Sequence, residues 1–138
     1  EYIMEFNIQN ELNHHLDIWQ SRIHSGMKHG SDDWDKRSFG WVKELAENPV
    51  RAARSERRVA ETAKYLRTRG LLSPDQNVID IGCGPGRFVA EFARTAGSAT
   101  GTDISPQMCA FGKEYADSLG LDNVILIYLW KMPLSKVD

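Results

Sequence analysis

Several features that mark specialised classes of protein are missing from this sequence. It has only two cysteines, Cys83 and Cys109, which excludes a disulfide-rich scaffold and favours a reducing, cytoplasmic setting. No apolar run approaches the ~18 residues of a membrane-spanning helix. Residues 1–13 lack the basic stretch and apolar core of a secretory signal. Fixed-period repeats and low-complexity tracts are also missing.

An excess of charge of one sign is missing as well. The 17 basic residues nearly balance the 19 acidic ones, giving a net charge of −2. We therefore expect no nucleic-acid partner and no membrane partner. The histidines, at positions 14, 15, 24 and 29, lack the spacing of ligands on one helix face and have no cysteine nearby. This pattern predicts no metal site.

The 138 residues that are present have the length of one domain, enough to bury a core. The chain divides into two parts of different character. Residues 1–70 are predicted to form a helical N-terminal cap or lid. Residues 71–138 are predicted to form a cofactor-binding part, and the two together one structural domain.

Two helices are predicted in the N-terminal part. Apolar residues recur at steps of three and four between Ile8 and Ile23, the period of one helix face. Asn48 followed by Pro49 is typical of a helix start, and Gly70 of a helix end. The many charges between them are expected to form a solvated face.

The second part alternates short apolar runs with helix-like spacing. Strands are predicted at residues 77–81, 98–103 and 123–130, and helices at 88–97 and from Pro106 to Gly120. Alternation of strand and helix indicates a parallel sheet with right-handed crossovers. The predicted fold is therefore α/β and Rossmann-like, with helices on both faces of the sheet.

Three glycines, Gly82, Gly84 and Gly86, lie where the first strand should become a helix. Glycine permits positive φ and close approach of a ligand to the backbone. The helix that follows offers free N–H groups and a partial positive charge. Such a turn binds a nucleotide-like ligand or an anion.

The spacing discriminates between cofactors. A dinucleotide site has the pattern G-x-G-x-x-G, but its third glycine position is occupied here by Arg87. Asp80 precedes the loop, where a carboxylate suits a ligand with a cationic amino group. An NAD-type dinucleotide-binding domain remains an alternative, because Asp103 would hold an adenosine ribose equally well.

The stretch 80–86 (D-I-G-C-G-P-G) resembles motif I of class I S-adenosylmethionine-dependent methyltransferases. The resemblance implies that Gly82, Cys83, Gly84 and Gly86 wrap the amino-acid end of S-adenosylmethionine, with Asp80 reaching it through water or backbone. The stretch 101–105 (G-T-D-I-S) resembles motif II of the same family. It implies that Asp103 binds both ribose hydroxyls through charge-assisted hydrogen bonds.

The same resemblance implies further site residues. Ile104 would pack near the adenine, and Met108 would line the adenine pocket. Residues 34–39 resemble the aromatic and basic segment that forms a lid in small-molecule methyltransferases, which makes Trp34, Arg37 and Phe39 candidate lid or substrate residues.

The implied function is methyl transfer from S-adenosylmethionine to a small-molecule acceptor, with S-adenosylhomocysteine as product. Such an in-line displacement depends mainly on positioning and electrostatics, so we assign no catalytic residue. The chain resembles the N-terminal part of the family fold, with three of its strands in the order 3-2-1. We therefore expect an incomplete chain with little turnover of its own.

The first strand, residues 77–81, would then form an exposed apolar edge, which predicts a homodimer. A non-catalytic cofactor-binding or oligomerising module is the alternative from a different functional class.

Overall fold

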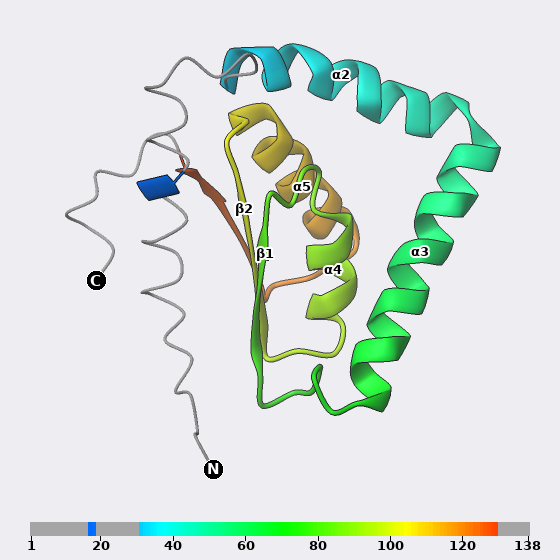
Figure 1. Ribbon diagram of the computed structural model, residues 1–138, viewed down its shortest axis with the longest axis vertical. Helices are drawn as coiled ribbons and strands as arrows, with labels where there is room; N and C mark the ends of the chain where they lie inside the picture. Colours follow the sequence, from blue (N-terminus) through cyan, green and yellow to red (C-terminus); the bar gives the residue numbers. More distant parts are fainter. Residues whose placement is uncertain (1–16, 19–30, 130–138) are drawn as a thin grey trace.

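The computed structural model describes residues 17–18 and 31–129 (Figure 1). The elements in chain order are α2 (Ser31–Glu47), α3 (Pro49–Thr68), β1 (Asn77–Ile81), α4 (Arg87–Ala93), β2 (Ser98–Asp103), α5 (Pro106–Ser118) and β3 (Val124–Tyr128). Residues 17 and 18 are helical. The rest of the helix predicted between Ile8 and Ile23, and the end of the predicted third strand at Trp130, lie outside the described residues.

The three strands form a parallel sheet in the order β1-β2-β3. This confirms the predicted order, with β2 in the middle. In the register, Asp80 lies opposite Gly101, and Asp103 lies opposite Tyr128. All strands therefore direct their carboxyl ends, with Asp80 and Asp103, to one edge of the sheet.

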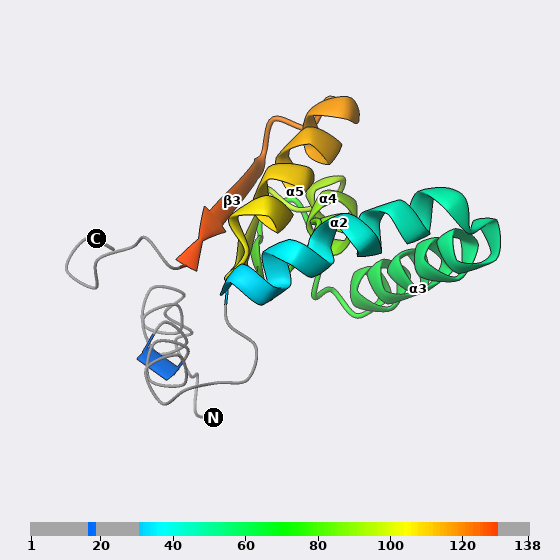
Figure 2. The same ribbon diagram turned by 90° about the horizontal axis from the view of Figure 1, so that it is seen from above.

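The helices described here cover one face of the sheet. Helix α4 packs on β1 and β2, α5 packs on β2 and β3, and α3 packs on α4. Figure 2 shows these helices together on one side of the strands. Covering of both faces, as predicted, is not seen within residues 31–129. The reason is geometric: two successive right-handed crossovers that advance in the same direction leave both helices on the same face.

The start and end of α3 agree with the sequence prediction. The Asn48 side chain accepts a hydrogen bond from the Arg51 backbone N–H at 3.1 Å, and Pro49 occupies the first turn. Gly70 follows the helix with a φ of 68°. Val59 and Ala63 are buried and attach the helix to the rest of the core.

Helix α2 has no counterpart in the sequence prediction. Its first residues continue the polar stretch that begins at Gly30, and such residues are as common in loops as in the first turn of a helix. In the structure, α2 contacts both α3 and α5. Tertiary contacts thus determine this helix.

Small residues let α4 approach the sheet closely. A Cβ on Gly101 would lie 2.7 Å from the Cys83 sulfur and 2.8 Å from Val89. Cys83 and Val89 belong to the main core cluster, together with Ala99 of β2. This packing sets the position of the glycine loop between β1 and α4. Within residues 17–18 and 31–129, no helix has the length and apolar character needed to cross a membrane.

Candidate functional site

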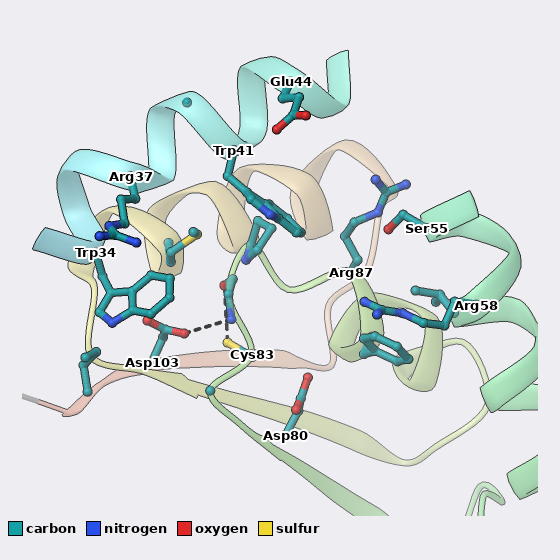
Figure 3. Close-up of a pocket in the computed structure, with 18 of the residues that line it drawn as sticks. Trp34, Arg37, Trp41, Glu44, Ser55, Arg58, Asp80, Cys83, Arg87 and Asp103 are labelled. Carbon is teal, nitrogen blue, oxygen red and sulfur yellow. Dashed lines mark hydrogen bonds between the residues drawn. The ribbon is translucent and has the colours of Figure 1, made fainter. Parts of the chain in front are cut away.

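A cavity of about 850 Å³ opens at the carboxyl ends of the strands and is roofed by α2 and α3 (Figure 3). Nine of the residues singled out from the sequence line it: Trp34, Arg37, Asp80, Gly82, Cys83, Gly84, Asp103, Ile104 and Met108. Gly86 and Phe39 are the two that do not. The motifs from distant parts of the chain therefore meet at one site.

The glycine loop has the backbone geometry that its sequence predicts. Gly82, Gly84 and Gly86 have φ values of 74°, 54° and 73°, which other residues rarely adopt. The N–H groups of Gly82 and Cys83 both donate to the Thr102 carbonyl, at 2.8 and 2.9 Å. Gly86 begins α4, and a Cβ there would lie 3.1 Å from the Gly112 Cα. Gly86 thus serves close packing against α5.

Asp103 joins the two motifs. Its Oδ2 accepts a hydrogen bond from the Gly84 N–H, and its Oδ1 accepts one from the Ser105 N–H, both at 2.9 Å. Burial raises the pKa of Asp103, while these backbone donors lower it. The Ile104 N–H also bonds this carboxylate, which has about four acceptor positions in all. The group can therefore still accept a hydrogen bond from a ligand.

Asp80 lies in the same cavity and is half-buried. Burial, and then the negative charge of Asp103, raise its pKa from 3.8 to about 6. Two carboxylates in one partly dry cavity repel each other and favour a cationic ligand group.

Cys83 is 8% exposed, and its thiol donates to the Gly84 carbonyl at 3.5 Å. Burial, followed by the charge of Asp103, raises the pKa of this thiol far above its ordinary value. The thiol therefore stays protonated near neutral pH and is a poor nucleophile. Among residues 17–18 and 31–129, no group of three or more His, Cys, Asp or Glu is arranged to hold a metal ion.

The predicted lid residues separate into two groups. Trp34 and Arg37 line the cavity from α2, and the Arg37 guanidinium carbon lies 5.7 Å from the Trp34 ring centroid. Arg37 also forms an ion pair with Asp33 at 3.3 Å. Phe39 packs edge-on against Phe111 of α5 instead, with 5.5 Å between ring centroids. It attaches α2 to the domain.

Sequence reasoning missed about half of the lining. The missed residues are Gly40, Trp41, Glu44, Ser55, Arg58, Val59, Pro85, Arg87, Phe88 and Leu129. Arg87 and Phe88 directly follow the glycine loop, so their place at the start of α4 could have indicated them. Residues of α2 and α3 carry no such signal, because tertiary packing alone brings them to the loop.

Two of the arginines that line the cavity, Arg58 and Arg87, lie at one end, and Arg37 lies at the other. In Figure 3 the side chains are spread from Trp34 and Asp103 at one end, past Asp80, to Arg58 and Arg87 at the other. Arg87 forms an ion pair with Glu56 at 3.3 Å. The Arg58 guanidinium carbon lies 5.6 Å from the Phe88 ring centroid.

The part of the chain that contains the glycine loop and Asp103 is similar to known proteins. Residues 72–128 match the family model described as a methyltransferase domain. This range spans β1 to β3, including the glycine loop and Asp103.

Two relatives illustrate the similarity. The chain is 35% identical over 60 residues to a probable cobalt-precorrin-6B C(15)-methyltransferase of Methanobrevibacter smithii, covering 43% of this chain and 32% of that protein. It is 32% identical over 88 residues to the 23S rRNA (uracil(1939)-C(5))-methyltransferase RlmD of Xanthomonas euvesicatoria, covering 60% of this chain and 19% of that protein. The chain thus spans a third or less of either relative.

A solved structure supports the fold. Magnesium protoporphyrin IX methyltransferase from Synechocystis PCC 6803, crystallised with bound S-adenosylhomocysteine, superposes with a TM-score of 0.57 at 17% identity. The match covers 70% of this chain and 48% of that chain. At this identity the likeness concerns the α/β, Rossmann-like fold alone.

Proposed function

We propose that residues 72–128 are part of a class I S-adenosylmethionine-dependent methyltransferase domain, and that the cavity binds S-adenosylmethionine for methyl transfer to a small-molecule acceptor. The observation that carries the proposal is the position of Asp103. Its two carboxylate oxygens are fixed by Gly84 and Ser105 at the carboxyl ends of the strands, where open α/β sheets bind their ligands.

Asp103 is the proposed partner of the ribose hydroxyls. An ionised carboxylate that keeps acceptor capacity at the end of β2 suits the hydroxyl donors of a ribose. Ile104, Met108 and Leu129 are buried and line the cavity, and they supply apolar surface for the adenine.

The amino-acid end of the cofactor is proposed to lie over the glycine loop. Asp80 would bind the cationic amino group, which would also stabilise the ionised form of Asp80. Arg58, toward the far end of the cavity in Figure 3, offers a guanidinium for the carboxylate.

The role of the chain in the reaction would be to position and to exclude water. The carboxylates of Asp80 and Asp103 would favour binding of the positively charged sulfonium cofactor. The cavity volume of about 850 Å³ lies in the upper part of the usual range for ligand sites, roughly 300–1,000 Å³. This leaves room for an acceptor beside the cofactor, under Trp41 and Glu44 of α2.

The proposal also assigns a role to each of the two predicted parts of the chain. Residues 1–70 would form the cap and residues 71–138 the cofactor-binding part. Helices α2 and α3 support it, since both supply lining residues to the roof of the cavity.

Parallel calorimetric titrations with S-adenosylhomocysteine and NADH test the cofactor. We expect binding of S-adenosylhomocysteine and much weaker binding of NADH. Tighter binding of NADH would overturn the proposal in favour of a dinucleotide-binding domain, because Asp103 suits an adenosine ribose in either case. Methyl transfer itself is tested by release of S-adenosylhomocysteine with a panel of small-molecule acceptors.

We further propose that two copies associate through β1. Within residues 31–129, β1 pairs with a strand on one side only, and it carries the apolar residues Val78, Ile79 and Ile81 without lysine or proline. Light scattering coupled to gel filtration should detect a dimer at micromolar concentration. A single species of 15.6 kDa would contradict this.

A further inference from the structure

Helix α2 is joined to the first turn of α5 by one carboxylate. Asp35 accepts a hydrogen bond from the Ser105 hydroxyl and another from the Gln107 backbone N–H, the latter at 3.1 Å. Gln107 has one of the N–H groups that a helix start leaves without an intrahelical partner. The negative charge of Asp35 also suits the positive end of α5.

The contact lies beside the proposed ribose site. Ser105 is 0% exposed and is bonded on both sides. Its N–H donates to Asp103 at 2.9 Å, and its hydroxyl donates to Asp35 while accepting from the Met108 N–H at 3.1 Å. The carboxylates of α2 and β2 are thus held on the same residue.

Asp35 directly follows Trp34, which lines the cavity from α2. Figure 3 shows the Trp34 indole at the Asp103 end of the cavity. Trp34 is 40% exposed although it lines the cavity. A bound nucleoside could therefore cover ring surface that now faces solvent.

We propose that Asp35 is a positioning residue that holds α2 against Ser105 and Gln107, so that Trp34 closes the Asp103 end of the cavity over the bound cofactor. The inference rests on the proposed function and adds to it a means of retaining the ligand. Asp35 acts through Trp34 and does not itself line the cavity.

Other contacts of α2 would not replace this one. The Ser38 hydroxyl donates to the Asp35 carbonyl within the same helix at 2.6 Å. Phe39 packs edge-on against Phe111 one turn further along, and Glu44 pairs with Arg51 near the other end. Exposed ion pairs of this kind stabilise little. Without Asp35, the buried Ser105 hydroxyl and the Gln107 N–H would lose their acceptor, and the Trp34 end of α2 would be free to separate.

The test measures S-adenosylhomocysteine binding to the full chain and to Asp35→Ala, Trp34→Ala and the double variant. We expect each single variant to weaken binding about tenfold, mainly through faster dissociation. The double variant should also lose about tenfold, because both changes remove the same cover, whereas independent effects would multiply to about a hundredfold. Glu47→Ala, at the exposed far end of α2, is the matched control and should bind as the parent does.

Two further readouts separate positioning from a general structural role. Asp35→Asn keeps an acceptor oxygen for Ser105 and Gln107, so it should recover most of the affinity. Hydrogen exchange of the α2 amides should quicken in Asp35→Ala while exchange in β1 and β2 stays unchanged. If Asp35→Ala does not fold, the same comparison is made with Asp35→Asn, which should show a smaller loss of affinity. Adding Asp35→Asn to Trp34→Ala should then cause no further loss.

A hundredfold loss in the double variant, or affinity in Asp35→Ala equal to that of Glu47→Ala, would overturn the inference. Failure of the parent chain to bind S-adenosylhomocysteine would instead refute the proposed function. Exchange would still decide the positioning role in that case, and unchanged α2 amides in Asp35→Ala would refute it.

Discussion

The carboxylate of Asp103, at the end of β2, accepts a hydrogen bond from the backbone N–H of Gly84, in the loop after β1, at 2.9 Å. The residue proposed to hold the ribose therefore also holds the loop that is proposed to receive the amino-acid end. Binding and local structure are coupled at this bond, and variants of Asp103 should affect both.

We predict that Asp103→Ala weakens S-adenosylhomocysteine binding by about 10- to 100-fold, since hydrogen bonds to a charged group contribute roughly 1.5–3 kcal/mol. It should also lower the free energy of unfolding by roughly 1–3 kcal/mol, because the N–H groups of Gly84 and Ser105 lose their acceptor. Calorimetry and chemical unfolding measure the two effects.

Asp103→Asn and Asp117→Ala complete this series. The asparagine keeps an oxygen acceptor, so its unfolding free energy should fall less than that of Asp103→Ala, while its affinity still drops through loss of charge. Asp117 pairs with Lys113 on the surface of α5, and its removal should leave binding unchanged. Parent-like affinity in both Asp103 variants would rule out the ribose assignment.

The elevated pKa of Asp80 predicts a pH-dependent stability. Its pKa is raised from 3.8 to about 6 on folding, so between these values the folded chain binds more protons than the unfolded chain. Stability contributed by the protonated form is therefore present below about pH 4 and is lost as the pH rises through 6. With allowance for solvent screening the loss is roughly 1–2 kcal/mol, and Asp80→Asn should remove it. Urea unfolding from pH 4.5 to 7.5 measures it.

Ligand affinity should have the opposite dependence on pH. If the ionised form of Asp80 binds the cofactor's amino group, affinity for S-adenosylhomocysteine should fall about tenfold between pH 7.5 and pH 5, with the midpoint near the pKa of about 6. Calorimetry in matched buffers checks this. Affinity that is flat with pH in the parent, or equally steep in Asp80→Asn, would show that Asp80 does not bind the amino group.

Arg58 and Arg57 form a matched pair on neighbouring positions of α3. Arg58 lines the cavity, whereas Arg57 is paired with Glu61 at 2.7 Å on the outer surface. Arg58→Ala should weaken binding of S-adenosylhomocysteine about tenfold. It should leave the affinity for 5′-methylthioadenosine unchanged, because this ligand lacks the amino-acid end. Arg57→Ala should change neither affinity. An equal loss for both ligands in Arg58→Ala would place this guanidinium elsewhere on the ligand.

Two glycine substitutions should have opposite effects on stability. Gly101→Ala would drive a Cβ to within 2.7 Å of the Cys83 sulfur and 2.8 Å of Val89, so we expect a loss of about 1–3 kcal/mol. Gly40 lies inside α2, and a Cβ there would meet no neighbouring heavy atom within 4 Å, so Gly40→Ala should stabilise by about 0.5–1 kcal/mol. Thermal unfolding of the two variants, compared with the parent, measures both. A stabilising Gly101→Ala would mean that α4 can move away from β2.

The features of the site that could be predicted from the sequence are those that neighbouring residues in the sequence determine. The glycines at 82, 84 and 86 need positive φ, and Ser105 followed by Pro106 has the pattern of a helix start, so their structure follows from neighbouring residues. The parallel sheet followed from the alternation of strand and helix, whereas the order of its strands followed from the resemblance to the methyltransferase family. Each of these features depends on residues that lie close together in the sequence.

The roof could not be predicted in this way. Asp35 and Ser105 are 70 residues apart, and nothing near either residue indicates the other. Helix α2 starts in a polar stretch that resembles a loop, and its inner face is defined by α3 and α5. The same reason explains why Phe39 was grouped with Trp34, although it packs on Phe111.

Because Cys83 is buried within the glycine loop, the rate at which its thiol reacts can report how often the loop opens. A sulfur that is covered in the closed loop reacts with an excess of a thiol reagent only during the moments when the loop opens. In a chain carrying Cys109→Ala, the rate of modification would therefore give the frequency of opening directly. Saturating ligand would lower the rate of Cys83 modification by the factor by which it stabilises the closed loop. A single cysteine would therefore report occupancy of the site without a label, a substrate or turnover.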